Sequence, residues 1–252
     1  MRIKVINPNT TQSMTDKIGA CARAAARPGT EVVAVSPSMG PVSIESHYDE
    51  ALAVPGLLAE IAAGEAEGFD GYVIACFGDP GLKAARELAH APVVGIAEAA
   101  MHLASMLGSR FSVVTTLERT VGQAWHLAEA YGMDRFCAKV RACELPVLEL
   151  EEPGSGARER ILQECRTALE EDGCDVLVLG CAGMADLCAF LSRTLQVPVI
   201  DGVAAAVQLV DSLASLGLRT SKRAELAPPP AKPITGLLAP FTIGGRALRR
   251  AA

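Results

Sequence analysis

The 252-residue sequence has few aromatic residues, and neither its single tryptophan nor its three tyrosines locate a binding pocket. No apolar run is long enough to span a bilayer, and the apolar stretch at the N-terminus is too short for a signal peptide. No stripe of Lys and Arg precedes the C-terminal tail, and the formal charge is −6. These absences predict a cytoplasmic protein that binds neither a membrane nor nucleic acid.

Motifs for metals and nucleotides are also missing. No Cys-x-x-Cys pair or Cys/His cluster has the spacing of a zinc site, and no Gly-x-Gly-x-x-Gly motif or phosphate loop follows a predicted strand. The eight cysteines are predicted to be reduced, because a chain of this length with a large apolar core does not need disulfides. Six of them are interpreted as core residues, namely Cys21, Cys137, Cys143, Cys165, Cys174 and Cys188.

Short apolar runs alternate with amphipathic or alanine-rich stretches along the chain. Strands are predicted at 3–6, 31–35, 71–75, 93–94, 111–115, 138–142, 175–179 and 199–200. Helices are predicted at 14–26, 51–63, 82–88, 98–107, 123–131, 159–171 and 204–216. This alternation predicts an α/β protein whose parallel sheets are covered on both faces.

The chain also repeats itself. In each half, an apolar strand ends at a cysteine, and a glycine-containing turn, a helix and a Pro-Val pair follow. Cys76 precedes Pro92 by 16 positions, and Cys181 precedes Pro198 by 17. Ligands of open parallel sheets bind beyond the carboxyl ends of the strands. If the two halves face each other, both thiols converge on one cleft.

The residues after Cys76 indicate how its thiol could react. A helix is predicted to begin at Asp79-Pro80, because Asp is a favoured N-cap and Pro is favoured in the first turn. Its free N–H groups would lower the pKa of the thiol and could hold an enolate or imide oxygen. No Arg or Lys lies within five positions of either repeated cysteine, which favours a small, neutral ligand.

Simpler interpretations compete with these. A single cysteine at a strand end is more often a core residue, and it is the repeat that favours a functional pair. His47 could serve as a general base, but Ser46 and Asp49 are spaced as a capping box. His47 is therefore predicted to lie on the surface where a helix begins.

Five segments resemble hydantoin racemases of the aspartate/glutamate/hydantoin racemase superfamily, and the resemblance extends to about Leu226. The segments are Val5–Thr10, Gly40–Glu45, Ile74–Gly81, Val113–Thr116 and Leu179–Met184. The resemblance implies two Rossmann-like (flavodoxin-like) domains, each with a four-stranded parallel sheet, related by a pseudo-twofold axis, with the active site in the cleft between them. It implies one domain at 1–97 plus 202–227 and a second at 98–201. Residues 228–252 are a proline-rich linker and tail, expected on the surface or on a neighbouring subunit.

The resemblance also implies a function and a site. The expected reaction is racemisation of a 5-monosubstituted hydantoin at C5 by two catalytic cysteines, Cys76 and Cys181, in a homo-oligomer that uses no metal and no cofactor. The expected substrate-binding residues are Asn9, Phe77, Gly78, Asp79, Thr115, Thr116, Gly180, Ala182 and Gly183.

Several alternatives remain open. Allantoin racemase would use the same chemistry on a 5-ureido substituent, and no pocket residue decides between the two. An aspartate or glutamate racemase is disfavoured by the uncharged residues beside the cysteines. An arylmalonate-type decarboxylase needs only the second cysteine. A non-catalytic two-lobed binder would keep the cleft and leave the thiols incidental.

Overall fold

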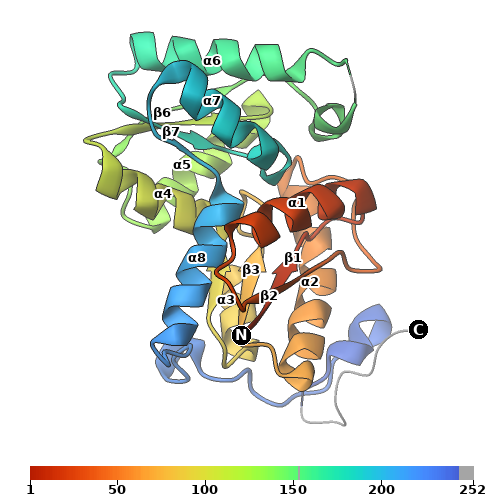
Figure 1. Cartoon of the computed structure of the whole chain (residues 1–252). Helices are drawn as coiled ribbons and strands as arrows, with labels where there is room; N and C mark the ends of the chain where they lie inside the picture. The colour runs from red at the N-terminus through yellow and green to blue at the C-terminus, as the bar shows by residue number, and fades with distance from the viewer. Residues whose placement is uncertain (153, 244–252) are drawn as a thin grey trace.

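The computed structural model describes residues 1–152 and 154–243. The first half of the chain is built on one parallel sheet (Figure 1). The strands are β1 (Arg2–Ile6), β2 (Glu31–Val35), β3 (Gly71–Ile74) and β4 (Val93–Gly95), in the order β2-β1-β3-β4. The central strands β1 and β3 are almost entirely buried, as expected for strands covered on both faces.

The second half repeats this sheet. Its strands are β5 (Phe111–Thr115), β6 (Cys137–Ala142), β7 (Val176–Leu179) and β8 (Val199–Ile200), in the order β6-β5-β7-β8. All neighbouring strands are parallel, so each half has the same strand order. The predicted fold class is confirmed, and every predicted strand is found within about a residue of its expected bounds.

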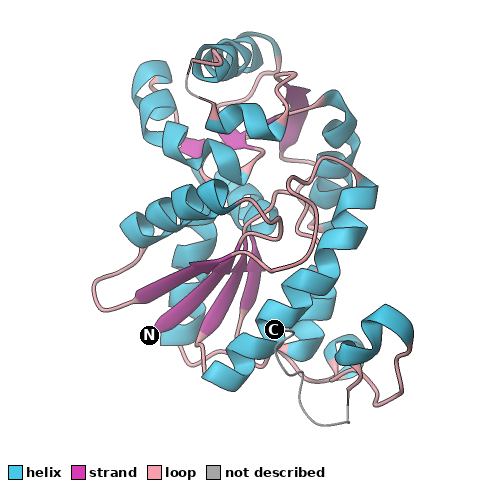
Figure 2. Cartoon of the chain, turned by 90° about the vertical axis from the view of Figure 1, so that its right-hand side faces the viewer, coloured by secondary structure: helices cyan, strands magenta, loops and turns pink. Residues whose placement is uncertain are grey.

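Helices cover both faces of each sheet (Figures 1 and 2). They are α1 (Gln12–Ala25), α2 (His47–Glu67), α3 (Leu82–Leu88), α4 (Ile96–Leu107), α5 (Val121–Ala130), α6 (Ala157–Glu171), α7 (Cys188–Leu195) and α8 (Gly202–Ser215). None of the helices within the described residues is long and apolar enough to cross a membrane.

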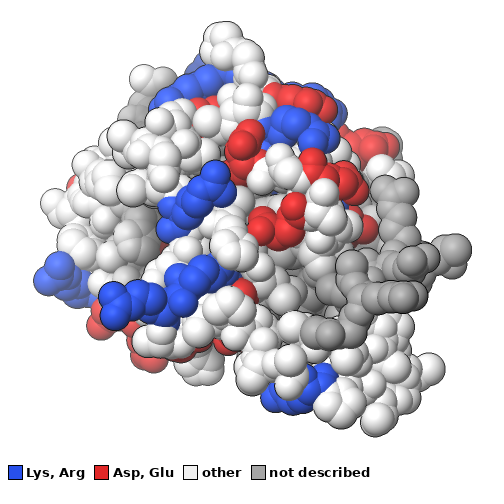
Figure 3. All heavy atoms as spheres, turned by 90° about the horizontal axis from the view of Figure 1, so that it is seen from below, with Lys and Arg blue, Asp and Glu red and all other residues white. Residues whose placement is uncertain are grey.

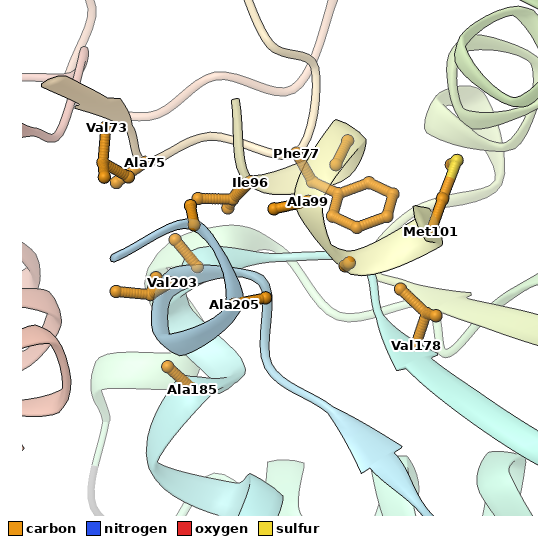
Figure 4. Close-up of a cluster of buried hydrophobic side chains, with 14 of the residues drawn as sticks. Val73, Ala75, Phe77, Ile96, Ala99, Met101, Val178, Ala185, Val203 and Ala205 are labelled. Carbon is orange, nitrogen blue, oxygen red and sulfur yellow. The ribbon is translucent and has the colours of Figure 1, made fainter. Parts of the chain in front are cut away.

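One apolar cluster runs through both halves, and α4 and α8 lie at its centre. Val73 of β3 and Val178 of β7 belong to this cluster together with Ile96 of α4 and Val203 of α8 (Figure 4). The two helices begin very close together: a Cβ at Gly202 would lie 2.6 Å from the carbonyl oxygen of Ile96. This shared core fixes the position of one sheet relative to the other.

After α8 the chain runs back along the outside of the first half (Figure 1). The Thr220 hydroxyl donates to the Ala91 carbonyl at 2.8 Å, and Lys222 donates to the Glu87 carbonyl at 3.1 Å. The segment is mostly exposed as far as residue 243, which agrees with the expected surface position, and residues 244–252 lie outside the described residues.

Lys, Arg, Asp and Glu side chains all occur on the face seen in Figure 3.

Candidate active site

A cavity lies where the carboxyl ends of both sheets meet. Strands β1, β3, β5 and β7 each end in residues that line it. The lining residues from these strand ends are Asn7, Asn9, Ala75, Cys76, Phe77, Gly78, Thr115, Thr116, Gly180, Cys181 and Ala182. The structure therefore brings together both repeated cysteines and seven of the nine expected binding residues. The other two, Asp79 and Gly183, do not line the cavity.

Cys76 follows β3 and is half-buried in the wall of the cavity. Burial raises the pKa of its thiol far above the ordinary value, a hydrogen bond from the Gly78 N–H opposes the shift, and the charges of Glu50 and Cys181 add to it. A lowered pKa had been predicted from a nearby helix N-terminus. That prediction is wrong, because desolvation of the sulfur outweighs the backbone N–H.

Cys181 occupies the equivalent position after β7, directly before a 3-10 helix at Ala182–Leu187. Burial raises the pKa of its thiol to about 11, opposed by a hydrogen bond from the Gly183 N–H and by the charge of Lys17. Gly183 thus contacts the sulfur although it lies outside the cavity lining. The two thiols are chemically unequal, because the Lys17 cation opposes the effect of the Glu45 and Glu151 carboxylates on Cys181, whereas Cys76 lies near the carboxylates of Glu50 and Asp79.

Asp79 does not cap the helix after Cys76 as predicted. The helix after Cys76 begins at Leu82 and follows Gly81, not Asp79. Asp79 adopts a left-handed conformation with φ of 43° and turns its carboxylate toward α4. There it accepts hydrogen bonds from the backbone N–H groups of Ala97 at 3.1 Å and Glu98 at 2.9 Å.

The Asp79 carboxylate also accepts a 2.7 Å hydrogen bond from the Tyr131 hydroxyl of the second half. Burial raises its pKa to about 7, although these three donors oppose the shift. Asp79 is therefore a positioning residue: it ties the turn after Cys76 to the start of α4 and to Tyr131.

Amide and hydroxyl groups form the buried floor of the cavity. The Asn7 side chain donates to Asn9 at 2.8 Å and to Thr15 at 3.0 Å. The Thr115 hydroxyl bonds to Thr120 at 3.0 Å and to the Gly180 carbonyl at 3.2 Å. These bonds fix the side chains before any ligand binds, so the floor is preorganised.

Other lining residues were not predicted from the sequence. They are Asn7, Met14, Ile44, Glu50, Ala75, Thr120, Gln123, Ala124 and Val147. Most lie on helices or loops that are distant in sequence from the two cysteines, so no local pattern indicated them. His47, by contrast, is exposed at the start of α2 as predicted, and the Ser46–Asp49 capping box is confirmed.

A short 3-10 helix, η2 (Val147–Glu151), connects the two halves beside the cavity. The N–H of Val147 donates to the Glu45 carboxylate at 2.7 Å, and Lys17 donates to the Leu150 carbonyl at 3.1 Å. Lys17 also forms a 2.8 Å ion pair with Glu151. These contacts hold a wall of the second half against the first.

The remaining cysteines contribute to packing. Cys137, Cys143, Cys165 and Cys174 are buried among apolar side chains, as predicted, and Cys21 and Cys188 are half-buried beside them. All eight thiols are free. Within residues 1–152 and 154–243, no three His, Cys, Asp or Glu side chains converge as metal ligands would.

Comparison with known proteins identifies the family. The model of the Asp/Glu/Hydantoin racemase family matches residues 3–210. The chain is 49% identical to hydantoin racemase of Pseudomonas sp. (strain NS671), covering 96% of this chain and 97% of that protein. It is 50% identical to hydantoin racemase of Rhizobium meliloti, covering 94% and 98%.

A solved structure agrees closely with the fold. Allantoin racemase from Klebsiella pneumoniae superimposes with a TM-score of 0.94 at 56% identity, covering 96% of this chain and 99% of that chain. The chain described here belongs to the Asp/Glu/hydantoin racemase family. It is an isomerase, a racemase acting on a small molecule.

Proposed function

We propose that this enzyme racemises 5-monosubstituted hydantoins at C5, with Cys76 and Cys181 as its two acid–base groups and without a cofactor. The observation that carries the proposal is the position of the two thiols. They lie at equivalent strand ends of a repeated fold and line one cavity. That arrangement suits proton transfer on opposite faces of a carbon atom.

In the proposed reaction, one cysteine acts as a thiolate and removes the proton from C5. The electron pair of the C–H bond moves into the neighbouring carbonyl and gives an enolate, which the polar groups of the floor stabilise. The thiol of the other cysteine then protonates C5 from the opposite face. The reaction leaves the two cysteines with exchanged protonation states, ready for the other enantiomer.

The charges around the cavity suggest which thiol ionises first in the free enzyme. Burial raises the pKa of both thiols. Lys17 opposes this rise at Cys181, where Glu45 and Glu151 add to it, whereas Glu50 adds to the rise at Cys76. We infer that the free enzyme ionises first at Cys181 and retains the proton on Cys76.

The deciding experiment follows the circular-dichroism signal of an enantiopure 5-alkylhydantoin without added cofactor. The wild type should abolish the signal, while Cys76→Ser and Cys181→Ser, folded normally, should not. Cys21→Ser is the matched control, because Cys21 is half-buried outside the cavity lining. If either active-site variant kept near-full turnover, the two-cysteine scheme would be wrong.

Allantoin, a hydantoin with a 5-ureido group, is the second candidate substrate. The 56% identity to the Klebsiella pneumoniae allantoin racemase favours it. Enantiopure allantoin is therefore assayed beside the alkylhydantoin. Activity on neither compound would return the decarboxylase and binder alternatives to consideration.

We also propose the division into lobes at 1–97 plus 202–227 and at 98–201, with 228–252 as a linker and tail. The packing of α8 on α1 and β3 supports assigning it to the first lobe. Free thiols throughout the chain are compatible with the proposed cytoplasmic location. A homo-oligomer is proposed from the family alone.

A further inference from the structure

The open side of the cavity carries a carboxylate, that of Glu50, whose charge also acts on the Cys76 thiol. Glu50 lies in the first turn of α2, and its side chain is 21% exposed. A Cβ added to Gly78 would lie 2.0 Å from its Oε1 atom. The carboxylate therefore occupies space that only a glycine two residues after Cys76 leaves free.

Glu50 is held in place from both halves of the molecule. Its carboxylate lies 3.6 Å from Nδ1 of His47, on its own helix, and the side chain of Gln123, on α5, also acts on it electrostatically. His47 and Gln123 also approach each other, with 3.2 Å between Nδ1 and Nε2. Among the described residues, His47 is the one basic side chain within ion-pair distance of Glu50, and it is 78% exposed. The carboxylate thus remains an acceptor for a ligand.

The cavity is asymmetric in its exposure. Its floor is formed by Asn7, Asn9, Thr115 and Thr116, which are all buried. Seven lining residues are half-buried: Cys76, Gly78 and Cys181 at the strand ends, and Ile44, Glu50, Thr120 and Gln123 around them.

The reaction fixes how a hydantoin sits in this cavity. C5 must lie between the two sulfurs, so the polar edge of the ring faces the floor. The C5 substituent then projects toward the half-buried residues beyond the strand ends, and three of these four, Glu50, Thr120 and Gln123, are polar.

We propose that Glu50, supported by Gln123, selects substrates whose C5 substituent is a ureido group over those with an alkyl substituent. The inference rests on the proposed function and specifies its substrate. A ureido group offers two parallel N–H donors that match the two oxygens of a carboxylate, and the Gln123 amide can donate to its carbonyl. An alkyl group would desolvate the carboxylate without providing a donor.

The test compares kcat/KM for allantoin and for 5-isobutylhydantoin, both followed by circular dichroism. The wild type should prefer allantoin. Glu50→Leu should lower the ratio of kcat/KM for allantoin to kcat/KM for 5-isobutylhydantoin by about tenfold or more. A site built to hydrogen-bond a substituent discriminates by at least this factor against one that lacks the matching groups. Glu50→Gln keeps the shape and one acceptor oxygen, and should lower the ratio less.

Glu65→Gln is the matched control, because Glu65 lies on the same helix but away from the cavity and should leave the ratio unchanged. A purely structural role for Glu50 would lower both kcat/KM values together, and an unchanged ratio would overturn the inference. A wild type that prefers the alkylhydantoin would overturn it too, while leaving the proposed racemisation intact. A wild type that racemises neither compound would refute the proposed function and this inference with it.

Discussion

The buried carboxylate of Asp79 is a place where two opposing electrostatic effects can be separated by experiment. Three donors, two backbone N–H groups and the Tyr131 hydroxyl, favour its ionised form. Burial favours the neutral form and prevails, so the pKa rises from 3.8 to about 7. The perturbation is Asp79→Asn, which mimics the neutral carboxyl in shape and tolerates the left-handed backbone.

The sign of the effect on stability follows from linkage. Because the folded pKa is above the unfolded one, the stabilising contribution is complete below about pH 4 and is lost as the pH rises through about 7. Between about pH 5 and pH 8 the loss corresponds to roughly two pKa units, or about 3 kcal/mol. The asparagine side chain of the variant does not titrate, so the difference in free energy of unfolding, wild type minus variant, should fall by about that amount.

Urea denaturation of both proteins, followed by circular dichroism, measures this difference at the two pH values. Asp175→Asn is the control of opposite sign, because the N–H groups of Ser109 and Arg110 lower the pKa of that exposed carboxyl. The stabilising contribution of Asp175 is lost only as the pH falls below about 4. The difference in free energy of unfolding between the wild type and Asp175→Asn should therefore be constant from pH 5 to 8. If the difference for Asp79 were constant or rose with pH, the three donors would prevail over burial, and the reasoning would be refuted.

Three further predictions concern the cavity and its supports. Iodoacetamide should modify Cys181 before Cys76, and the rate at Cys181 should rise about tenfold per pH unit up to the thiol pKa of about 11. Mass spectrometry identifies which cysteine carries the adduct. A rate that stopped rising below about pH 8 would contradict the raised pKa. Gly95→Ala should destabilise the fold by about 1–3 kcal/mol in urea denaturation, because its Cβ would lie 2.2 Å from a buried carboxyl carbon. Gly122→Ala, which meets only open space, is its control. Glu45→Ala should remove the carboxylate that accepts the hydrogen bond from the Val147 N–H at the start of η2. This loss should lower the free energy of unfolding by about 1–3 kcal/mol and raise KM more than it lowers kcat. An unchanged KM would show that this contact does not shape the cavity.

Much of the fold could be predicted because its strands are short and continuously apolar. Segments such as Val176–Leu179 and Gly71–Ile74 are buried along their whole length. A strand buried on both faces appears in the sequence as an unbroken apolar run, without polar alternation, between turn residues. The repeat in the sequence indicated the repeat in the strand order. That same repeat located the cysteine pair, since equivalent positions after β3 and β7 reach the same cavity.

The rest of the site could not be predicted because it depends on contacts between distant segments. Asp79-Pro80 has the local pattern of a helix start, but the carboxylate binds N–H groups of α4 about twenty residues later. Glu50 and Gln123 meet only when α2 and α5 face each other across the cavity. The thiol pKa values also depend on burial, which no sequence motif reports.

The two halves share a strand order, yet the proposed reaction requires their cysteines to differ in protonation state. Burial raises the pKa of both thiols, but the charges beside them differ. Lys17 lowers the pKa of Cys181 while Glu45 and Glu151 raise it, whereas the charges of Glu50 and Asp79 both raise that of Cys76. A thiolate at Cys181 would further raise the pKa of Cys76, so loss of the first proton opposes loss of the second. The pair therefore disfavours the double thiolate. When one proton is lost, one thiolate faces one thiol, which is the state that proton transfer between opposite faces of C5 requires.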